Sequence, residues 1–275
     1  MPRSLRRKNL APPGKCIFCE GASGSGMSKE HIFPDWLREL FPRSPEDTHT
    51  HGFTSWAELS PGSPLSPITR SHRGQGQAST KKVRVVCRKC NNEWLGRLEK
   101  RMKPLLSQLI MGESVSLGDS EQLFIATWAA KTIMTAEYVD RKKVAVPQSD
   151  RTFLMRNLSP PQNGRWIWIA GSQSMEWLTG INHFSARLNI SPVDLKTPEI
   201  VNLQSTTIGI ARLLIHAIST TVPGHSFALN DPDNSDLRQI WPLGPEISWP
   251  PQNFLTDDQV NGIARNVPRA FGHSA

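Results

Sequence analysis

The sequence contains few cysteines, almost no tyrosine and no long apolar run. Four of its 275 residues are Cys, and a single Tyr stands against nine Trp and ten Phe. Its most apolar stretch, 206–218, is interrupted by Arg212, so no segment reaches the roughly 18 apolar residues of a membrane helix. The basic first residues are not followed by the apolar core of a signal peptide. We therefore expect a cytoplasmic protein without a membrane partner, in which disulfides are disfavoured.

Positive charge is concentrated in the first part of the chain. Residues 1–103 contain 19 Lys or Arg against 9 Asp or Glu, whereas residues 104–275 contain 13 against 15. An excess of ten positive charges in one part is typical of a surface that binds a polyanion, although a solvated basic surface has the same composition. Residues 1–14 are basic and end in Ala-Pro-Pro-Gly, which predicts a disordered tail.

The four cysteines form two C-x-x-C pairs separated by 67 residues. Two turns of this kind can direct four thiolates at one ion, and a closed tetrahedral set is typical of structural zinc. Redox pairs and unliganded core cysteines are the alternatives, but a redox pair should open a helix in a βαβ unit. We expect structural Zn²⁺ to be held by Cys16, Cys19, Cys87 and Cys90.

The residues between and after these pairs carry a further pattern. Glu30-His31 precedes Ile-x-Pro, an apolar strand leads into the second pair, and Asn91-Asn92 follows it. This order resembles the four-cysteine subclass of the HNH endonuclease family over residues 15–103. The resemblance implies a ββα-metal finger, a β-hairpin and a helix joined by the zinc knuckles. It also implies a divalent cation, Mg²⁺ or Mn²⁺, and hydrolysis of phosphodiester bonds in nucleic acid.

The resemblance assigns a role to three side chains by their position. His31 corresponds to the general base, and Glu30 and Asn91 correspond to the ligands of the catalytic cation, with Asn92 as a second candidate on the helix. The residue types suit these roles, because neutral imidazole accepts a proton near pH 7 and hard cations prefer oxygen ligands.

Two positions depart from the family pattern. Where the family has an Asn that orients the catalytic His, this chain has Lys81 and Lys82, and a family Lys on the helix is Trp94 here. A lysine has no acceptor with which to orient an imidazole. A non-catalytic zinc-ribbon protein that binds nucleic acid is therefore the alternative function, and a protein-binding module is a third hypothesis.

We expect double-stranded DNA to be the partner, although the sequence does not distinguish DNA from RNA. Family association suggests a role in restriction or phage defence. A homo-oligomer or a protein partner bound through residues 119–275 is left open. Phosphate contacts are expected from the basic residues around the second cysteine pair, which are Lys81, Lys82, Arg84, Arg88, Lys89, Arg97 and Arg101.

The expected fold class is α+β. Residues 15–118 should form the zinc-stapled ββα module, with a long irregular insertion at 42–80, and residues 119–275 a second α+β domain with mostly antiparallel strands. Ser120 and Thr256 should cap helices. Richness in β-branched and aromatic residues between turns predicts strands at 165–172, 184–191 and 201–219, although 208–218 could instead be a buried helix. An apolar strand is also expected at 81–87.

Overall fold

The protein is described from a computed structural model. The described residues are 14–21, 26–41, 48–58, 65–75, 81–139, 144–186, 202–223 and 236–270. Within 48–58, 65–75 and 265–270 only the course of the backbone is described. In these ranges, none of the helices has both the length and the apolar character that a membrane span requires.

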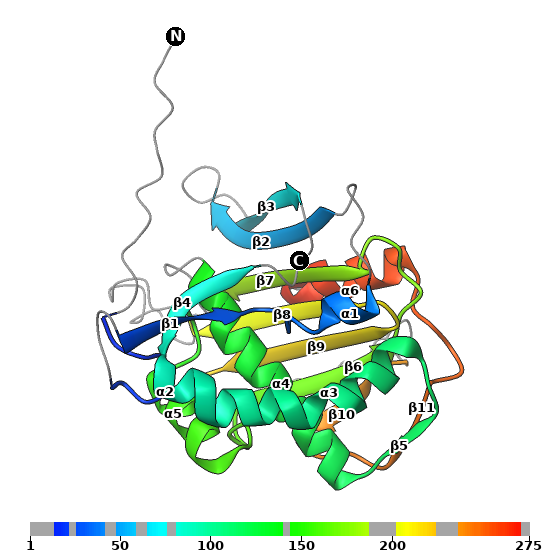
Figure 1. The fold of residues 1–275 in the computed structure, drawn as a ribbon. Coiled ribbons are helices and arrows are strands. Elements are labelled where there is room, and N and C mark those ends of the chain that lie inside the picture. Colours follow the sequence, from blue (N-terminus) through cyan, green and yellow to red (C-terminus); the bar gives the residue numbers. More distant parts are fainter. Residues whose placement is uncertain are drawn as a thin grey trace.

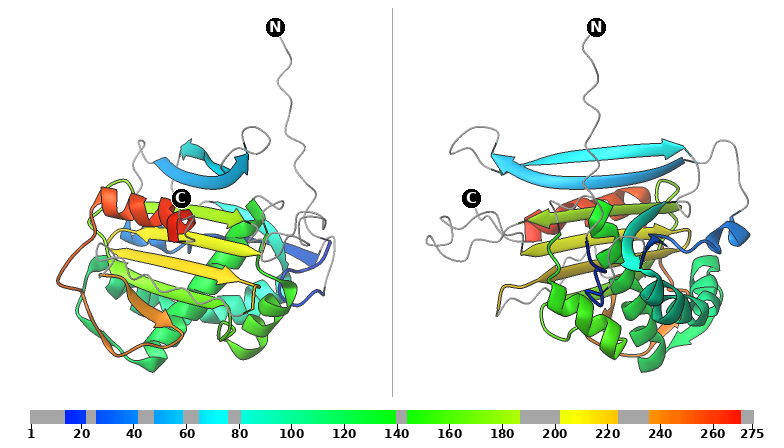
Figure 2. Two further views of the ribbon diagram at one scale, coloured as in Figure 1. Left: turned by 180° about the vertical axis from the view of Figure 1, so that it is seen from behind. Right: turned by 60° about the vertical axis from the view of Figure 1, so that its left-hand side comes forward.

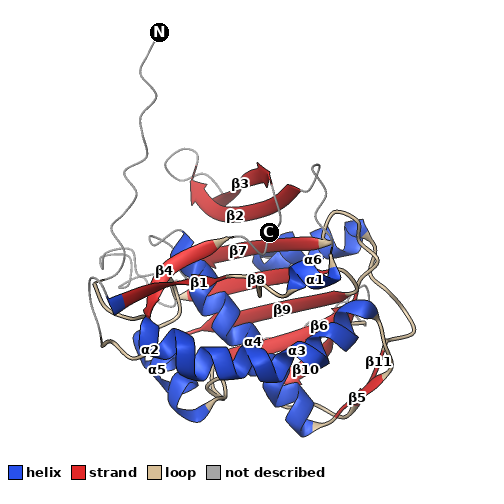
Figure 3. Cartoon of the chain, viewed as in Figure 1, coloured by secondary structure: helices blue, strands red, loops and turns tan. Residues whose placement is uncertain are grey.

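A seven-stranded sheet lies at the centre of the molecule (Figures 1 and 3). Its strand order is β10-β6-β9-β8-β7-β2-β3, and every neighbouring pair is antiparallel except β2 and β7. The strands are β2 (Thr48–Glu58), β3 (Leu65–Gln75), β6 (Arg165–Gly171), β7 (Thr179–Ala186), β8 (Leu203–Ile210), β9 (Leu213–Thr220) and β10 (Arg238–Trp241).

The apolar stretch 208–218 forms strands and not a helix. Ile210 pairs with Leu213, so Ala211 and Arg212 form a two-residue hairpin turn, and Ala211 adopts a φ of 47°. All eight residues of β8 and all eight of β9 are buried, because helices cover both faces of the sheet there. The prediction of strands across 201–219 is confirmed for the described residues.

Helices cover the two faces of the sheet unequally. On one face lie α3 and α4, and on the other lies α6 (Figure 2). Helix α4 is buried on nearly every side, because it lies between the sheet and the N-terminal part of the chain. The helices are α1 (Leu37–Leu40), α2 (Arg88–Cys90), the π-helical turn η3 (Asn91–Leu95), α3 (Gly96–Met111), α4 (Asp119–Ala136), the 3-10 turn η4 (Glu137–Val139), α5 (Gln148–Asn157) and α6 (Asp257–Ala270).

Two short antiparallel pairs flank the main sheet. Strand β1 (Met27–His31) pairs with β4 (Lys82–Cys87), and the chain then runs directly into the helical segment α2, η3 and α3. This β-β-α succession, together with the cysteine turn at residues 16–19 that precedes β1, is called the ββα unit below, and both cysteine pairs lie at its base. The other pair joins β5 (Val115–Leu117) to β11 (Ile247–Trp249).

The α+β class with mostly antiparallel strands is confirmed, but two local predictions were wrong. Part of the segment 42–80, expected to be irregular, forms β2 and β3 and extends the main sheet. Helix α4 is capped by Gly118 and not by Ser120, since the Glu121 carboxylate accepts a hydrogen bond from the Gly118 N–H at 3.1 Å. Thr256 does precede α6 and accepts from the Gln259 N–H at 3.5 Å.

The predicted division at residue 118 stays a prediction. One continuous cluster of buried side chains runs from Cys16 in the ββα unit through Trp128 in α4 to Trp249 in β11. The packing therefore joins the two proposed parts into a common core. The expected tail, 1–14, lies almost entirely outside the described residues, as does the end of the strand expected at 184–191.

Candidate functional site

The structure brings the four cysteines together at the base of the ββα unit. Their sulfur atoms all lie within 4.8 Å of one another, and Cys19 Sγ is 3.7 Å from Cys87 Sγ. With Zn–S bonds of about 2.3 Å, the sulfurs of a ZnS₄ tetrahedron lie about 3.8 Å apart. The cluster is thus a metal-binding arrangement whose spacing fits a zinc-sized ion.

Local backbone structure sets this spacing. In the first pair, the Glu20 N–H donates to Cys16 O at 2.9 Å, which closes the turn. In the second pair, Cys87 ends β4 and caps the following helix, because its Sγ accepts from the Cys90 N–H at 3.3 Å. The C-x-x-C at residues 87–90 therefore opens a helix, but it follows an antiparallel strand and not a parallel βαβ unit.

Helix α5, from the second part of the chain, supports the first cysteine turn. Gln148 Nε2 donates to Ile17 O at 2.9 Å, and Thr152 Oγ1 donates to Phe18 O at 3.1 Å. On the same helix, Met155 Sδ lies 3.9 Å from Cys90 Sγ. These contacts hold the two cysteine pairs in register with each other.

The pKa values of the cysteine thiols are shifted in different directions. Hydrogen bonding from the Cys90 thiol lowers the pKa of Cys16 to about 4. Burial raises the pKa of Cys19, whereas the Cys16 sulfur beside it, followed by burial, raises the pKa of Cys90. Four neighbouring thiolates need a cation, and a bound metal ion supplies it.

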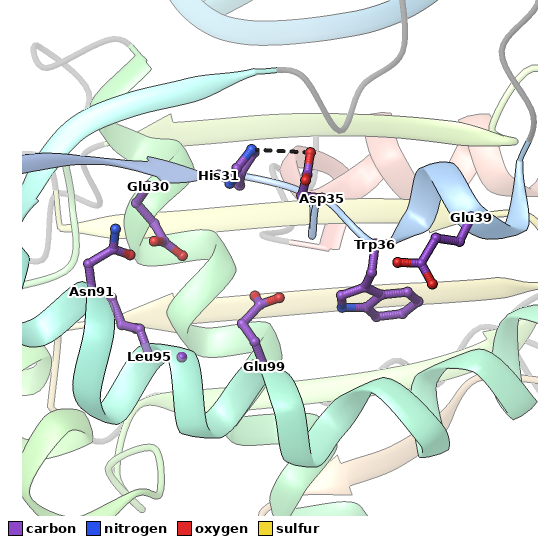
Figure 4. A pocket seen from close by; sticks show the side chains of 9 residues that line it. Glu30, His31, Asp35, Trp36, Glu39, Asn91, Leu95 and Glu99 are labelled. Carbon is purple, nitrogen blue, oxygen red and sulfur yellow. Dashed lines mark ion pairs between the residues drawn. The ribbon is translucent and has the colours of Figure 1, made fainter.

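A separate pocket of about 330 Å³ opens beside the ββα unit (Figure 4). A bulge between Ser28 and Lys29 shifts the alternation of β1, so that Met27 and Glu30 are both buried although they lie three residues apart. This places Glu30 at the pocket rather than on the solvent side of the strand. The lining residues are Glu30, His31, Asp35, Trp36, Glu39, Asn91, Leu95, Gly96 and Glu99.

His31 ends β1 and contributes its imidazole to the pocket. Its Nε2 is buried and makes no hydrogen bond with any described residue, while Asp35 Oδ1 lies 3.6 Å away, beyond hydrogen-bond distance (Figure 4). Burial lowers the pKa of His31 below 6.5, and the Lys82 ammonium lowers it further against the opposing effect of Asp35. The imidazole is therefore neutral near pH 7 and has a ring nitrogen free to accept a proton.

Asn91 faces the pocket from the helix, but it does not cap that helix. The helical segment begins at Arg88, so Asn91 lies inside it, in the π-helical turn. Its Nδ2 donates to Ser28 Oγ at 2.9 Å, and its amide oxygen faces Glu30 (Figure 4). Asn92 is exposed and does not line the pocket. The two asparagines are thus distinguished by their surroundings.

Glu30 shares a buried ammonium with a second carboxylate. Lys131 Nζ, from α4, lies 3.1 Å from Glu30 Oε1 and 2.6 Å from Glu99 Oε1. Burial opposes the charge of Lys131, but the two carboxylates outweigh it and raise its pKa above 10.5. Burial also raises the pKa of Glu30, although Lys131 opposes that shift. We take all three groups as charged, because both N–O distances are those of charge-assisted hydrogen bonds.

The carboxylates of the pocket differ in how they are compensated. None of the lining residues is Lys or Arg. At the rim, Asp35 pairs with Arg38 at 2.8 Å and Glu39 with Lys103 at 2.6 Å, so each has a cation of its own. At the floor, Glu30 and Glu99 share Lys131. The floor therefore carries one uncompensated negative charge among the described residues.

The basic residues expected to contact phosphate lie on the same ββα unit. Lys81 differs from the rest, because it is half-buried and burial lowers its pKa to about 8. Lys82 stands opposite His31 in the strand pairing, and the Arg101 guanidinium stacks 4.0 Å above the Phe124 ring. The exposed members of the set are Lys82, Arg84, Arg88, Lys89, Arg97 and Arg101.

Asp35 and Glu99, which line the pocket, and Lys131, which pairs with the carboxylates of its floor, are among the residues not predicted from the sequence. Asp35 and Glu99 carry a weak signal, since they lie four residues after His31 and eight after Asn91, spacings that return to a similar side of a turn or helix. Lys131 is a single charge inside the apolar run Thr127–Ala136, which marks it as buried and paired. Nothing in the sequence identifies its partners.

No family model, curated protein or solved structure matches the chain. The site is therefore argued from its own residues.

Proposed function

We propose that the protein is a metal-dependent endonuclease of the HNH type that hydrolyses phosphodiester bonds in DNA. The observation that carries the proposal is the His31 imidazole, whose Nε2 makes no hydrogen bond with a described residue and lies in one pocket with Glu30 and Asn91. These three side chains come from a strand and a helix of a β-β-α succession next to a four-cysteine cluster. This convergence of separate parts of the sequence supports the proposal.

In the proposed reaction His31 acts as general base. Its Nε2 takes a proton from a water molecule, the water oxygen attacks phosphorus, and the bond from phosphorus to the 3′ oxygen breaks. The products are a 5′ phosphate and a 3′ hydroxyl, the latter formed when the leaving oxygen takes up a proton. Burial and Lys82 favour the neutral imidazole that this role requires.

The pocket floor fits a hard divalent cation. Glu30 and Glu99 provide carboxylate oxygens, Asn91 provides an amide oxygen, and the floor has a negative charge in excess. A bound Mg²⁺ or Mn²⁺ would stabilise the charge that develops at the phosphate and the leaving oxygen. The four cysteines would hold Zn²⁺ in a closed, structural site.

Two observations favour a non-catalytic nucleic-acid-binding protein instead. Glu30 is already paired with the Lys131 ammonium, and Lys81 and Lys82 stand where the family has its orienting Asn. In that case the exposed basic side chains would still bind phosphate. Only the cleavage chemistry would be absent.

A plasmid-nicking assay with Mg²⁺ or Mn²⁺ separates these two functions. His31→Ala should lower the nicking rate by about 10²- to 10⁴-fold, the usual contribution of a general base. Zinc content, thermal unfolding and DNA affinity should stay close to those of the wild type, since His31 lies outside the cysteine cluster and the exposed basic set. Equal nicking by wild type and variant under every metal would favour the non-catalytic protein.

A further inference from the structure

We infer that Lys131 is a positioning residue that serves as a built-in cation of the pocket floor. This inference rests on the proposed function and extends it to α4, whose role the sequence does not predict. Lys131 is fully buried, and its Nζ contacts one oxygen of Glu30 and one oxygen of Glu99. Lys131 thereby holds both carboxylates from the α4 side, and both carboxylates line the same pocket (Figure 4).

The charge of the group formed by Lys131, Glu30 and Glu99 has opposing consequences for binding of the cation and of the phosphate. With Lys131 present, the floor has a net charge of minus one, so a divalent cation makes it positive and able to attract a phosphodiester anion. Without Lys131, the floor would be doubly negative, and the same cation would only neutralise it. Lys131 therefore weakens binding of the cation by like-charge repulsion, yet it strengthens binding of the phosphate that reacts.

The contact also joins the two parts of the chain at the pocket. Lys131 approaches from α4, whereas Glu30 belongs to β1 and Glu99 to α3. Because α4 lies against the main sheet on its other side, the position of the ammonium is fixed by how α4 packs in the common core. The second part of the protein thus supplies a charge to the pocket of the ββα unit.

The test is a comparison of full-length, zinc-loaded wild type and Lys131→Met by Mn²⁺ titration and plasmid nicking. Free Mn²⁺ is followed by its electron paramagnetic resonance signal, and retained zinc is measured in parallel. We expect Lys131→Met to bind Mn²⁺ at least about tenfold more tightly than wild type. At saturating Mn²⁺ it should nick DNA at least about tenfold more slowly. A merely structural lesion would weaken both properties, so opposite changes distinguish the positioning role.

Glu99→Gln provides a second variant in case the two carboxylates left without Lys131 prevent Lys131→Met from folding. It leaves Glu30 and Lys131 as a balanced pair, so its Mn²⁺ affinity should fall at least about tenfold below wild type. Glu39→Gln is the matched control, because it removes a carboxylate of the same pocket that has its own partner, Lys103. Its affinity should change by less than about threefold, given the weak energetics of exposed pairs.

The outcomes separate this inference from the proposed function. If Lys131→Met binds Mn²⁺ while wild type neither binds it nor nicks DNA, the built-in cation is supported and the nuclease function is overturned. If folded Lys131→Met binds Mn²⁺ no more tightly than wild type, the inference is wrong whatever the nicking assay shows. Equal losses in Glu99→Gln and Glu39→Gln would likewise contradict it, as would absence of Mn²⁺ binding in every variant.

Discussion

Two places in the ββα unit gather several ionisable side chains, and they differ in how their charge is balanced. The cysteine cluster is closed, with four sulfurs within 4.8 Å of one another. The pocket is open, and its floor contains the Lys131 ammonium between two carboxylates. A cluster of thiolates depends on an external ion, whereas the pocket floor is already partly neutralised by the chain. Folding should therefore depend on metal at the first place and not at the second.

The largest expected effect is loss of the fold when the cysteine cluster is broken. In Cys87→Ser the site loses one of its four thiolates, whereas the serine hydroxyl can still cap the helix. Apparent binding free energies of structural zinc are about 10–16 kcal/mol, comparable with the about 5–15 kcal/mol by which a whole domain is stable. We expect a misfolded protein without zinc, measured by elemental analysis and circular dichroism.

His31→Ala is the control for this experiment, because His31 lies in the pocket and not among the four sulfurs. It should retain one zinc per chain and the wild-type spectrum. An intact fold in protein that contains no zinc would show that the cluster is only a group of core thiols.

The next largest effect should distinguish the two neighbouring asparagines. Asn91→Ala removes an amide oxygen that faces Glu30, and it should lower nicking at limiting Mg²⁺ by about 10- to 100-fold. Higher Mg²⁺ should restore part of the rate, because the loss is one of metal affinity. Asn92→Ala removes an exposed side chain outside the pocket and should change the rate less than twofold. A larger effect at Asn92 would mean that another helix face binds the cation.

A third prediction concerns the stability of the fold in acid. Low pH protonates the thiolates of the cysteine cluster, and it also removes the contribution of a buried histidine in the main sheet. His216 is fully buried in β9, and burial lowers its pKa from 6.5 to about 4. Because the unfolded chain takes up this proton first, the contribution of His216 to stability is complete above about pH 6.5 and is lost as pH falls toward 4. From pH 7 to pH 5 the loss is about 2 kcal/mol.

The variant His216→Gln isolates this part of the acid sensitivity. Its free energy of unfolding should fall by about 2 kcal/mol less than that of wild type between pH 7 and pH 5, as measured by urea denaturation. The zinc-dependent part is common to both proteins and cancels in the comparison. Parallel curves would show that His216 is protonated in the folded protein.

The sequence predicts the cysteine cluster better than it predicts the pocket. Cys16 and Cys87 belong to short motifs whose spacing implies their geometry, and the apolar character of residues 81–87 predicts the strand that leads into the second motif. The pocket depends on contacts between distant residues. Glu30 and Lys131 are 101 positions apart, and their pairing follows from how α4 packs between the sheet and the ββα unit.

The cap of α4 and the strands β2 and β3 could not be predicted from the local sequence either. Ser120 is a good capping residue, yet the Glu121 carboxylate reaches back to Gly118, and the helix starts two positions earlier than a Ser120 cap would place it. The strands β2 and β3 contain Pro, Ser and Gly and show little alternation, but they pair with each other, and β2 also pairs with β7 at the end of the sheet. In both cases a specific partner overrides the local pattern.

The smallest effect is expected when a single exposed lysine on the outer surface of the ββα unit is replaced. Charges there are neither clustered around an ion nor buried. Lys82 is exposed and stands opposite His31, so its replacement by Ala should remove one phosphate contact. The slope of log affinity against log salt for duplex DNA should become shallower by about 0.9. Lys103→Ala removes an equal charge from the same unit, but Lys103 is paired with Glu39 at 2.6 Å. Its slope should match that of wild type, and an equal change in both variants would mean that net charge alone governs binding.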